Sequence, residues 1–168
     1  MYADIIKKRV FIYQLPQTIL LLAVSIILPF FMHLFPSFNN IPLGVRFIPM
    51  FYGPFLAVIF LKKTNAFFIS LVLPILNFLF TSHPESFQVF PLTVELFLFV
   101  LCLSFLSKIF GRFLGWGIFS YVISCFISSV INYFWITGVF SFLKVITISL
   151  PGIFVLQVID FITFKHNR

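Results

Sequence analysis

The sequence predicts an all-α integral membrane protein, folded as one compact bundle of six transmembrane helices over residues 1–168. Hydrophobic residues make up 61% of the chain and charged residues only 9%, so a soluble domain of this length would expose a largely apolar surface. The apolar runs are too numerous for a single-pass anchor. They also lack the alternation of apolar and polar residues that is typical of a membrane barrel.

The predicted spans are short, and several are broken by proline. They cover about residues 18–34, 47–61, 66–80, 91–106, 114–135 and 140–164. Residues 1–14 mix basic and apolar side chains, which predicts an interfacial segment that is retained rather than a cleaved signal peptide. The second span contains Pro49 and Pro54, and the third contains Pro74. Short, proline-interrupted neighbouring spans are typical of binding sites in transporters.

The basic residues predict the orientation of the chain in the membrane. In a six-span topology, nine of the eleven lysines and arginines fall on the side that holds both termini, and only Arg46 and Lys144 do not. Basic residues accumulate on the cytoplasmic side, so we expect both termini to be cytoplasmic, in the cytoplasmic (inner) membrane of a bacterial cell. The net charge of +7 therefore indicates orientation in a lipid bilayer rather than binding of nucleic acid.

Two connections on the outer side are rich in turn-forming and aromatic residues, and we expect them to cap a site. They are residues 35–46, which contain several asparagines and prolines, and residues 81–90, which join the third span to a helix predicted to begin at Pro91. Glu95 lies one turn inside that helix, and Lys144 lies one turn inside the sixth span. A charged group at such depth is costly and therefore indicates a functional site.

The predicted substrate-binding residues lie in the outward-facing part of the chain. They are Glu95, Lys144, Asn77, Asn132, His33, His83 and Tyr133. Structural roles remain open for most of them. Glu95 and Lys144 could pair with each other, Lys144 could reach the headgroups, and Asn77 could cap a backbone carbonyl freed by Pro74.

Other polar residues predict packing rather than binding. Tyr133 could belong to the aromatic belt at the membrane interface, and the two histidines could be ordinary hydrogen-bonded side chains. Serines recur every fourth residue on the fifth span, at Ser120, Ser124 and Ser128, a row that lets another helix approach closely. Cys102 and Cys125 lie in apolar segments without metal-type spacing, and we expect them to be packed side chains.

The sequence does not predict an enzyme, a cofactor or a metal. It contains no phosphate-binding loop, no histidines at metal-ligand spacing, no nucleophile elbow and no cluster of carboxylates. Active transport would therefore need energy from a partner or from an ion gradient.

Three consecutive segments resemble the substrate-binding (S) components of energy-coupling factor (ECF) vitamin transporters. The segment FIPMFYGPFLAVIF at 47–60 is similar to a helix start with proline and methionine that is common in the family. LVLPILNFLFTSHP at 71–84 is similar to the family form SPLLNxLLTGMP. FPLTVELFLF at 90–99 is similar to a family helix that begins with proline and has an early glutamate. The resemblance covers about a third of the chain, and it places Pro49, Met50, Pro74, Asn77, Pro84 and Glu95 at family-typical positions.

The resemblance implies a six-helix S-component fold that captures a small vitamin or precursor on the outer side. It also implies two kinds of partner, a membrane-embedded coupling subunit and a pair of cytoplasmic ATPases. The chain departs from the family at Ile27, where a small residue would follow Ala23 at a spacing of four, at Ser82-His83, where the family has glycine-methionine, and at residues 62–65, where it has glycines.

We therefore expect a substrate-specificity subunit of an ECF-type ABC importer. Its ligand could be a thiamine-type, pantothenate-type, pterin or nucleobase-like solute. One alternative is a non-transport membrane scaffold of the same fold in cell-wall or cell-shape machinery, which would use the serine row to hold its partners. The other is a solitary ion-coupled carrier, in which Glu95 would be the proton-linked residue.

Overall fold

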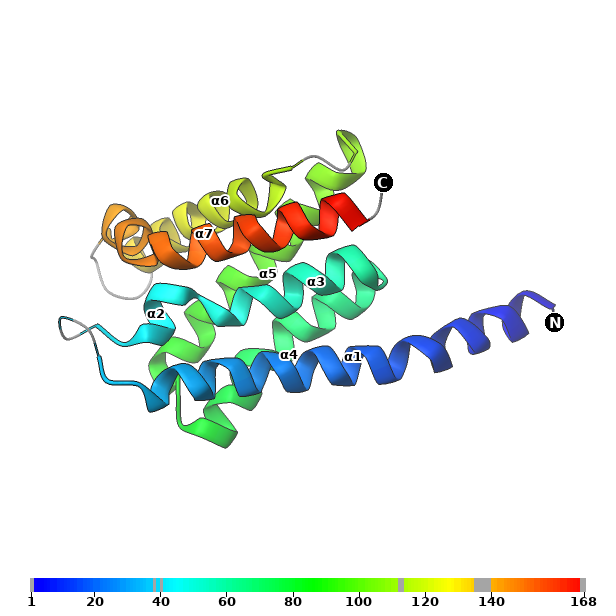
Figure 1. Ribbon diagram of the computed structural model, residues 1–168, viewed down its shortest axis with the longest axis horizontal. Coiled ribbons are helices and arrows are strands. Elements are labelled where there is room, and N and C mark those ends of the chain that lie inside the picture. The colour runs from blue at the N-terminus through cyan, green and yellow to red at the C-terminus, as the bar shows by residue number, and fades with distance from the viewer. Residues whose placement is uncertain (1, 38, 40, 112–113, 135–139, 167–168) are drawn as a thin grey trace.

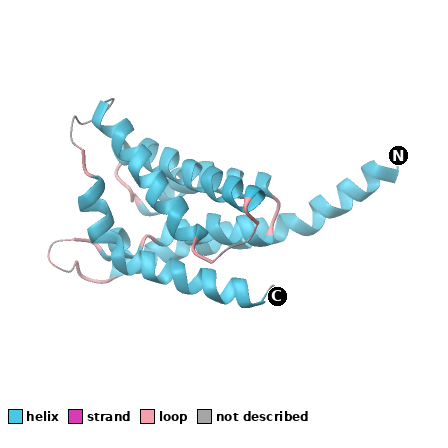
Figure 2. Ribbon diagram, turned by 90° about the horizontal axis from the view of Figure 1, so that it is seen from above, coloured by secondary structure: helices cyan, strands magenta, loops and turns pink. Residues whose placement is uncertain are grey.

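The computed structural model is all-helical and describes the backbone of residues 2–37, 39, 41–111, 114–134 and 140–166. Side chains are described in the same ranges except at residues 2–13, 33 and 166. The elements are α1 (Tyr2–Leu34), α2 (Leu43–Phe47), the 3₁₀ helix η1 (Pro49–Phe51), α3 (Tyr52–Phe60), α4 (Lys63–Thr81), α5 (Ser86–Ile109), α6 (Trp116–Asn132) and α7 (Phe142–His166). α1 and α7 lie along roughly one direction, α5 crosses them obliquely, and the first part of α1 projects beyond the other helices (Figure 1, Figure 2).

Four helical segments are long and apolar enough to cross a membrane. They are Gln14–Met32, Lys63–Thr81, Ser86–Ile109 and Phe142–Lys165. Two further apolar helices, Pro49–Phe60 and Trp116–Asn132, are shorter. At ~1.5 Å per residue they measure roughly 18 Å and 26 Å, against a hydrocarbon core of ~30 Å. The chain is thus an α-helical membrane protein, as its composition predicts.

The distribution of side chains is that of a protein solvated by lipid. Large apolar groups point outward: the exposed fraction is 72% for Phe80 and 72% for Leu143. Small polar groups point inward, and Ser70, Ser120 and Ser124 are completely buried. Lipid does not drive apolar side chains inward as water does, so helix contacts are built from small residues that let the backbones approach.

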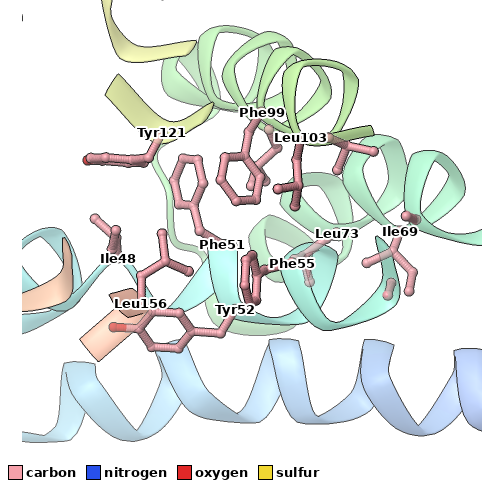
Figure 3. Packing of buried hydrophobic residues seen from close by; sticks show 14 of the residues in the cluster. Ile48, Phe51, Tyr52, Phe55, Ile69, Leu73, Phe99, Leu103, Tyr121 and Leu156 are labelled. Carbon is pink, nitrogen blue, oxygen red and sulfur yellow. The ribbon is translucent and has the colours of Figure 1, made fainter. Parts of the chain in front are cut away.

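The apolar core lies where η1 and α3 meet α5, α6 and α7. Figure 3 shows the Phe51 ring close to Phe99 and Tyr121, and both pairs are edge-to-face, with ring centroids 5.2 Å and 4.9 Å apart. Phe55 follows one turn later and packs on Gly117 of α6. A Cβ added to Gly117 would lie 2.8 Å from the Phe55 ring. The missing side chain at Gly117 therefore lets α6 come close to α3.

The two ends of the bundle hold different connections. Both termini lie at one end, together with the connection 61–62 and with residues 110–111 and 114–115 (Figure 1). α2 lies at the opposite end, where the connection 82–85 also lies (Figure 1). Alternation of helix direction along the chain produces this segregation. Because α5 begins at Ser86, Glu95 lies nine residues inside the helix and not one turn inside it as predicted.

The helix boundaries differ from those predicted at proline. The predicted interfacial segment 1–14 is continuous with the first span, because α1 runs through Pro16 and Pro29. α4 likewise continues through Pro74, and α5 begins at Ser86 and includes Pro91. Each proline removes a single backbone hydrogen bond, whereas ending the helix in an apolar environment would leave several groups unpaired.

The outer connection 35–46, predicted to be a loop throughout, contains the short helix α2. The Val45 amide donates to the Pro42 carbonyl oxygen at 3.1 Å, and the Ile48 amide donates to the Gly44 carbonyl oxygen at 3.2 Å. Ile48 then reverses the direction of the chain with φ 46° and ψ 44°, a left-handed conformation that is unusual for a β-branched residue. This turn directs η1 and α3 into the bundle.

Candidate functional site

A cavity of about 630 Å³ opens at the α2 end of the bundle. Pockets that bind small organic molecules commonly measure ~300–1,000 Å³. Its walls come from six helical elements and from the connection between α4 and α5. The lining residues are Pro29, Pro42, Gly44, Val45, Ile48, Pro49, Met50, Phe51, His83, Pro84, Glu85, Gln88, Pro91, Leu92, Glu95, Tyr121, Cys125, Ser128, Ser129, Asn132, Ser141 and Val145.

Aromatic rings line the inner part of this cavity. Phe51 and Tyr121 are almost fully buried, and their rings meet edge to face (Figure 3). Phe51 is held in turn by Phe99 from α5. Two of the lining rings thus belong to the packed core, which makes this part of the cavity wall rigid.

The wall formed by α2 and η1 is fixed against α7. The Tyr52 hydroxyl donates to the Phe47 carbonyl oxygen, and the Gly152 carbonyl oxygen lies 3.5 Å from the same hydroxyl. A Cβ at Gly152 would lie 2.5 Å from the Phe47 carbonyl carbon and 2.5 Å from Ile48 Cγ1. Glycine at this position is therefore what allows the Phe47–Ile48 backbone to pass directly over α7.

Glu95 is the acidic group in the inner part of the cavity. It comes from α5, and its Oε1 accepts a hydrogen bond from the Cys125 thiol of α6 at 2.9 Å. Ser128, Ser129 and Asn132 follow Cys125 at spacings of three, four and seven residues, so they occupy the same face of α6. The carboxylate therefore faces a helix side that carries a thiol, two hydroxyls and an amide.

Three of the predicted substrate-binding residues, Glu95, Asn132 and His83, line the cavity. Lys144 is exposed and is not among the lining residues, although Ser141 and Val145 on the same helix are. Lys144 adjoins the lining residue Val145 along α7, but its side chain leaves the helix in a different direction.

The remaining predicted residues lie elsewhere. Asn77 is completely buried in α4 away from the cavity, and its Oδ1 and Nδ2 have no hydrogen-bond partner in the described part of the chain. The predicted cap on a carbonyl freed by Pro74 is therefore not seen. Tyr133 is 46% exposed and packs edge to face on Phe134. The side chain of His33 lies outside the described residues.

The sequence interpretation missed several lining residues. The sequence pattern predicts helix packing for Cys125 and Ser128 and no role for Tyr121, yet all three line the cavity. A usable signal exists, because Cys125, Ser128 and Asn132 form a stripe with helical spacing that reaches the outer end of α6. What no local signal gives is the contact of Cys125 with Glu95, which is 30 residues earlier in the chain.

The opposite end of the bundle holds a small cavity of about 140 Å³ next to Trp116 and Asp160. Asp160 is 4% exposed, and its Oδ2 accepts a hydrogen bond from the Gly115 amide at 2.8 Å. Lys63 Nζ donates to the Ser104 carbonyl oxygen at 2.7 Å. These side chains join the end of one helix to the start or end of another, which is a structural role.

Comparisons with protein families, with curated proteins and with solved structures found no significant match to this chain. Among the described residues, no group of three or more His, Cys, Asp or Glu side chains could hold a metal ion. The functional argument therefore rests on the cavity at the α2 end and on the residues that line it.

Proposed function

We propose that the protein is the substrate-specificity subunit of an ECF-type ABC importer, which captures a small vitamin or vitamin precursor on the outer side of the membrane. The observation that carries this proposal is the 630 Å³ cavity in which Glu95 faces the polar side of α6. A helical membrane protein gains nothing in stability from such a hollow, because each uncontacted wall atom loses dispersion energy. A bound solute would restore those contacts.

The position of the cavity supports capture from outside. The cavity lies at the α2 end, whereas Lys62, Lys63 and Lys108 lie at the end that holds both termini. Basic connections favour the cytoplasmic side, so the cavity would face outward in a bacterial cytoplasmic membrane. Pro42 and the connection 82–85, which line the cavity, would lie at its entrance.

Two kinds of partner follow from the proposal. The sequence holds no phosphate-binding loop of its own, so ATP-driven uptake would need a pair of cytoplasmic ATPases. It would also need a membrane-embedded coupling subunit to transmit their motion. Release of the solute to the cytoplasm would follow tilting of the whole helix bundle.

The serine row bears on the scaffold alternative. Ser120 and Ser124 are completely buried against helices of the same chain, and Ser128 lines the cavity. These residues therefore offer no surface to a partner protein. A scaffold would have to bind its partners through other residues.

The test is purification of the tagged full-length chain from its own host in mild detergent, followed by quantification of the co-purifying proteins. The proposal predicts one membrane-embedded coupling subunit and two ATPase subunits in fixed ratio. It also predicts that liposomes with this complex take up the co-purified solute only when ATP is supplied. Cell-wall enzymes in place of ATPases would indicate the scaffold, and uptake by the chain alone under a proton gradient would indicate the carrier.

A further inference from the structure

The charges of the chain are distributed unequally around the large cavity. The whole sequence contains four acidic residues and eleven lysines and arginines. Two of the four acids, Glu85 and Glu95, line the cavity, whereas no lysine or arginine is among its described lining residues. The described lining of the cavity thus carries acidic side chains and no lysine or arginine, although the net charge of the protein is +7.

The basic residues closest along the chain to the cavity wall do not change this pattern. Arg46 adjoins the lining residue Val45 on α2, and Lys144 adjoins Val145 on α7, but neither lines the cavity. His83 also lines the cavity and is exposed in the connection between α4 and α5. Among the described lining residues, Glu95 is thus the acidic side chain of the inner part of the cavity.

The immediate surroundings of Glu95 suit a cationic ligand. Its hydrogen-bond donor is the Cys125 thiol, which is a weak donor and carries no positive charge. A carboxylate in a low-dielectric site is costly until a positive charge or strong donors compensate it. A bound cation would provide that compensation directly.

The aromatic wall favours the same chemical class. Phe51 and Tyr121 line the cavity together with Glu95 and Cys125. The two rings meet edge to face (Figure 3). The negative face of an aromatic ring attracts ammonium groups and positively charged rings. A carboxylate beside aromatic rings would therefore bind both the charge and the apolar body of a small organic cation.

We propose that the solute is a small organic cation, either a protonated or quaternary amine or a positively charged heteroaromatic ring, whose charge is bound by Glu95. This inference rests on the proposed function and narrows it. It excludes pantothenate-type anions, which Glu95 would repel, and it assigns to Gln88, Ser128, Ser129 and Asn132 the hydrogen bonds that orient the neutral part of the ligand.

The experiment is native mass spectrometry of the purified full-length protein with an equimolar mixture of thiamine, choline and tyramine as cations, pyridoxine as a neutral solute and pantothenate as an anion. The inference predicts that a cation is retained in preference to pyridoxine and pantothenate. Glu95→Gln, which keeps the size of the side chain and an acceptor for Cys125, should weaken its binding roughly 30-fold or more. Glu85→Gln should weaken it by roughly fivefold or less, because Glu85 is exposed and screened.

Lys144→Gln is the matched control, since it changes a charge on the wall helix α7 without altering the lining. The thermal unfolding of both variants is compared with that of the unchanged protein. This comparison separates loss of binding from loss of folding. Retention of pantothenate or pyridoxine instead of a cation would overturn the charge class and leave the proposed function intact. Equal cation binding before and after Glu95→Gln would overturn the role of Glu95. Retention of no member of the mixture would overturn the inference for ligands of this size.

Discussion

The two ends of the helix bundle use their polar residues differently. At the end that holds the termini, Asp160 accepts the Gly115 amide and Lys63 donates to the Ser104 carbonyl oxygen, so these side chains are bonded to backbone groups of other helices. At the α2 end, Glu95 and Asn132 line a cavity more than four times larger than the one beside Asp160 (about 630 Å³ against about 140 Å³).

This difference separates two uses of an acid inside a membrane protein. Asp160 accepts a hydrogen bond at the start of α6, where unpaired backbone amides and the helix dipole attract a negative group. Glu95 lies inside a helix, where the backbone amides are already used, and its hydrogen bond comes from a thiol. One carboxylate is therefore part of the framework, and the other is available to a ligand.

The largest expected effect comes from Gly152, the glycine that allows close approach of α2 to α7. At Gly152, a new Cβ would meet the Phe47 backbone at 2.5 Å, and backbone cannot move aside without shifting the cavity wall. We expect Gly152→Ala to lower the free energy of unfolding by about 3 kcal/mol, measured by thermal unfolding in detergent, and to abolish solute retention.

Gly117→Ala is the counterpart at the opposite end. The obstacle there is the side chain of Phe55, whose ring edge would lie 2.8 Å from the new Cβ and can rotate. We expect a loss of about 1 kcal/mol and unchanged solute binding. Equal loss of binding in Gly117→Ala and Gly152→Ala would show that the two ends are not independent.

The next effect concerns Asp160. Removal of its carboxylate in Asp160→Ala leaves the Gly115 amide at the start of α6 without its acceptor, so we expect a loss of about 1–2 kcal/mol in the free energy of unfolding. Asp160→Asn retains an acceptor oxygen and should lose less. Both variants should bind solute normally, and a selective loss of binding would assign Asp160 to the site.

The smallest effect is expected for Lys63→Met. The Ser104 carbonyl oxygen also accepts a hydrogen bond from the Ser107 hydroxyl at 3.1 Å, so it keeps a partner when Lys63 is removed. Lys63 itself is exposed, and we expect a loss of about 0.5 kcal/mol in thermal unfolding. A loss as large as that of Asp160→Ala would mean that the hydrogen bond from Lys63 to Ser104 also stabilises the end of the bundle that holds the termini.

The sequence predicted the class of the protein, and the structure confirms an all-helical membrane protein with four long apolar helices. The prediction that a helix begins at Pro91 was wrong, because a missing amide costs one hydrogen bond and lipid offers no replacement for the others that would be lost if the helix ended there. Glu95 and Asn132, both predicted to be site residues, line the cavity, but Glu95 lies nine residues inside α5 and not one turn inside a helix that begins at Pro91.

The direction of each side chain was harder to predict than its position along the chain. Lys144 and Val145 differ by about 100° around α7, but both lipid and core are apolar, so the hydrophobic pattern does not distinguish the inner from the outer face. Lys144 therefore lies outside the cavity lining, although Ser141 and Val145 on either side of it line the cavity. The pairing of Cys125 with Glu95 depends on how α5 packs on α6, which is a property of the tertiary structure.

The most direct test of the central claim is native mass spectrometry of the protein purified from its own host, comparing the unchanged chain with Glu95→Gln and Asp160→Asn. We predict one co-purified solute per chain in the unchanged protein and in Asp160→Asn, and its loss in Glu95→Gln. An empty unchanged protein, or a solute that Glu95→Gln retains in full, would contradict the assignment of the α2-end cavity as the binding site.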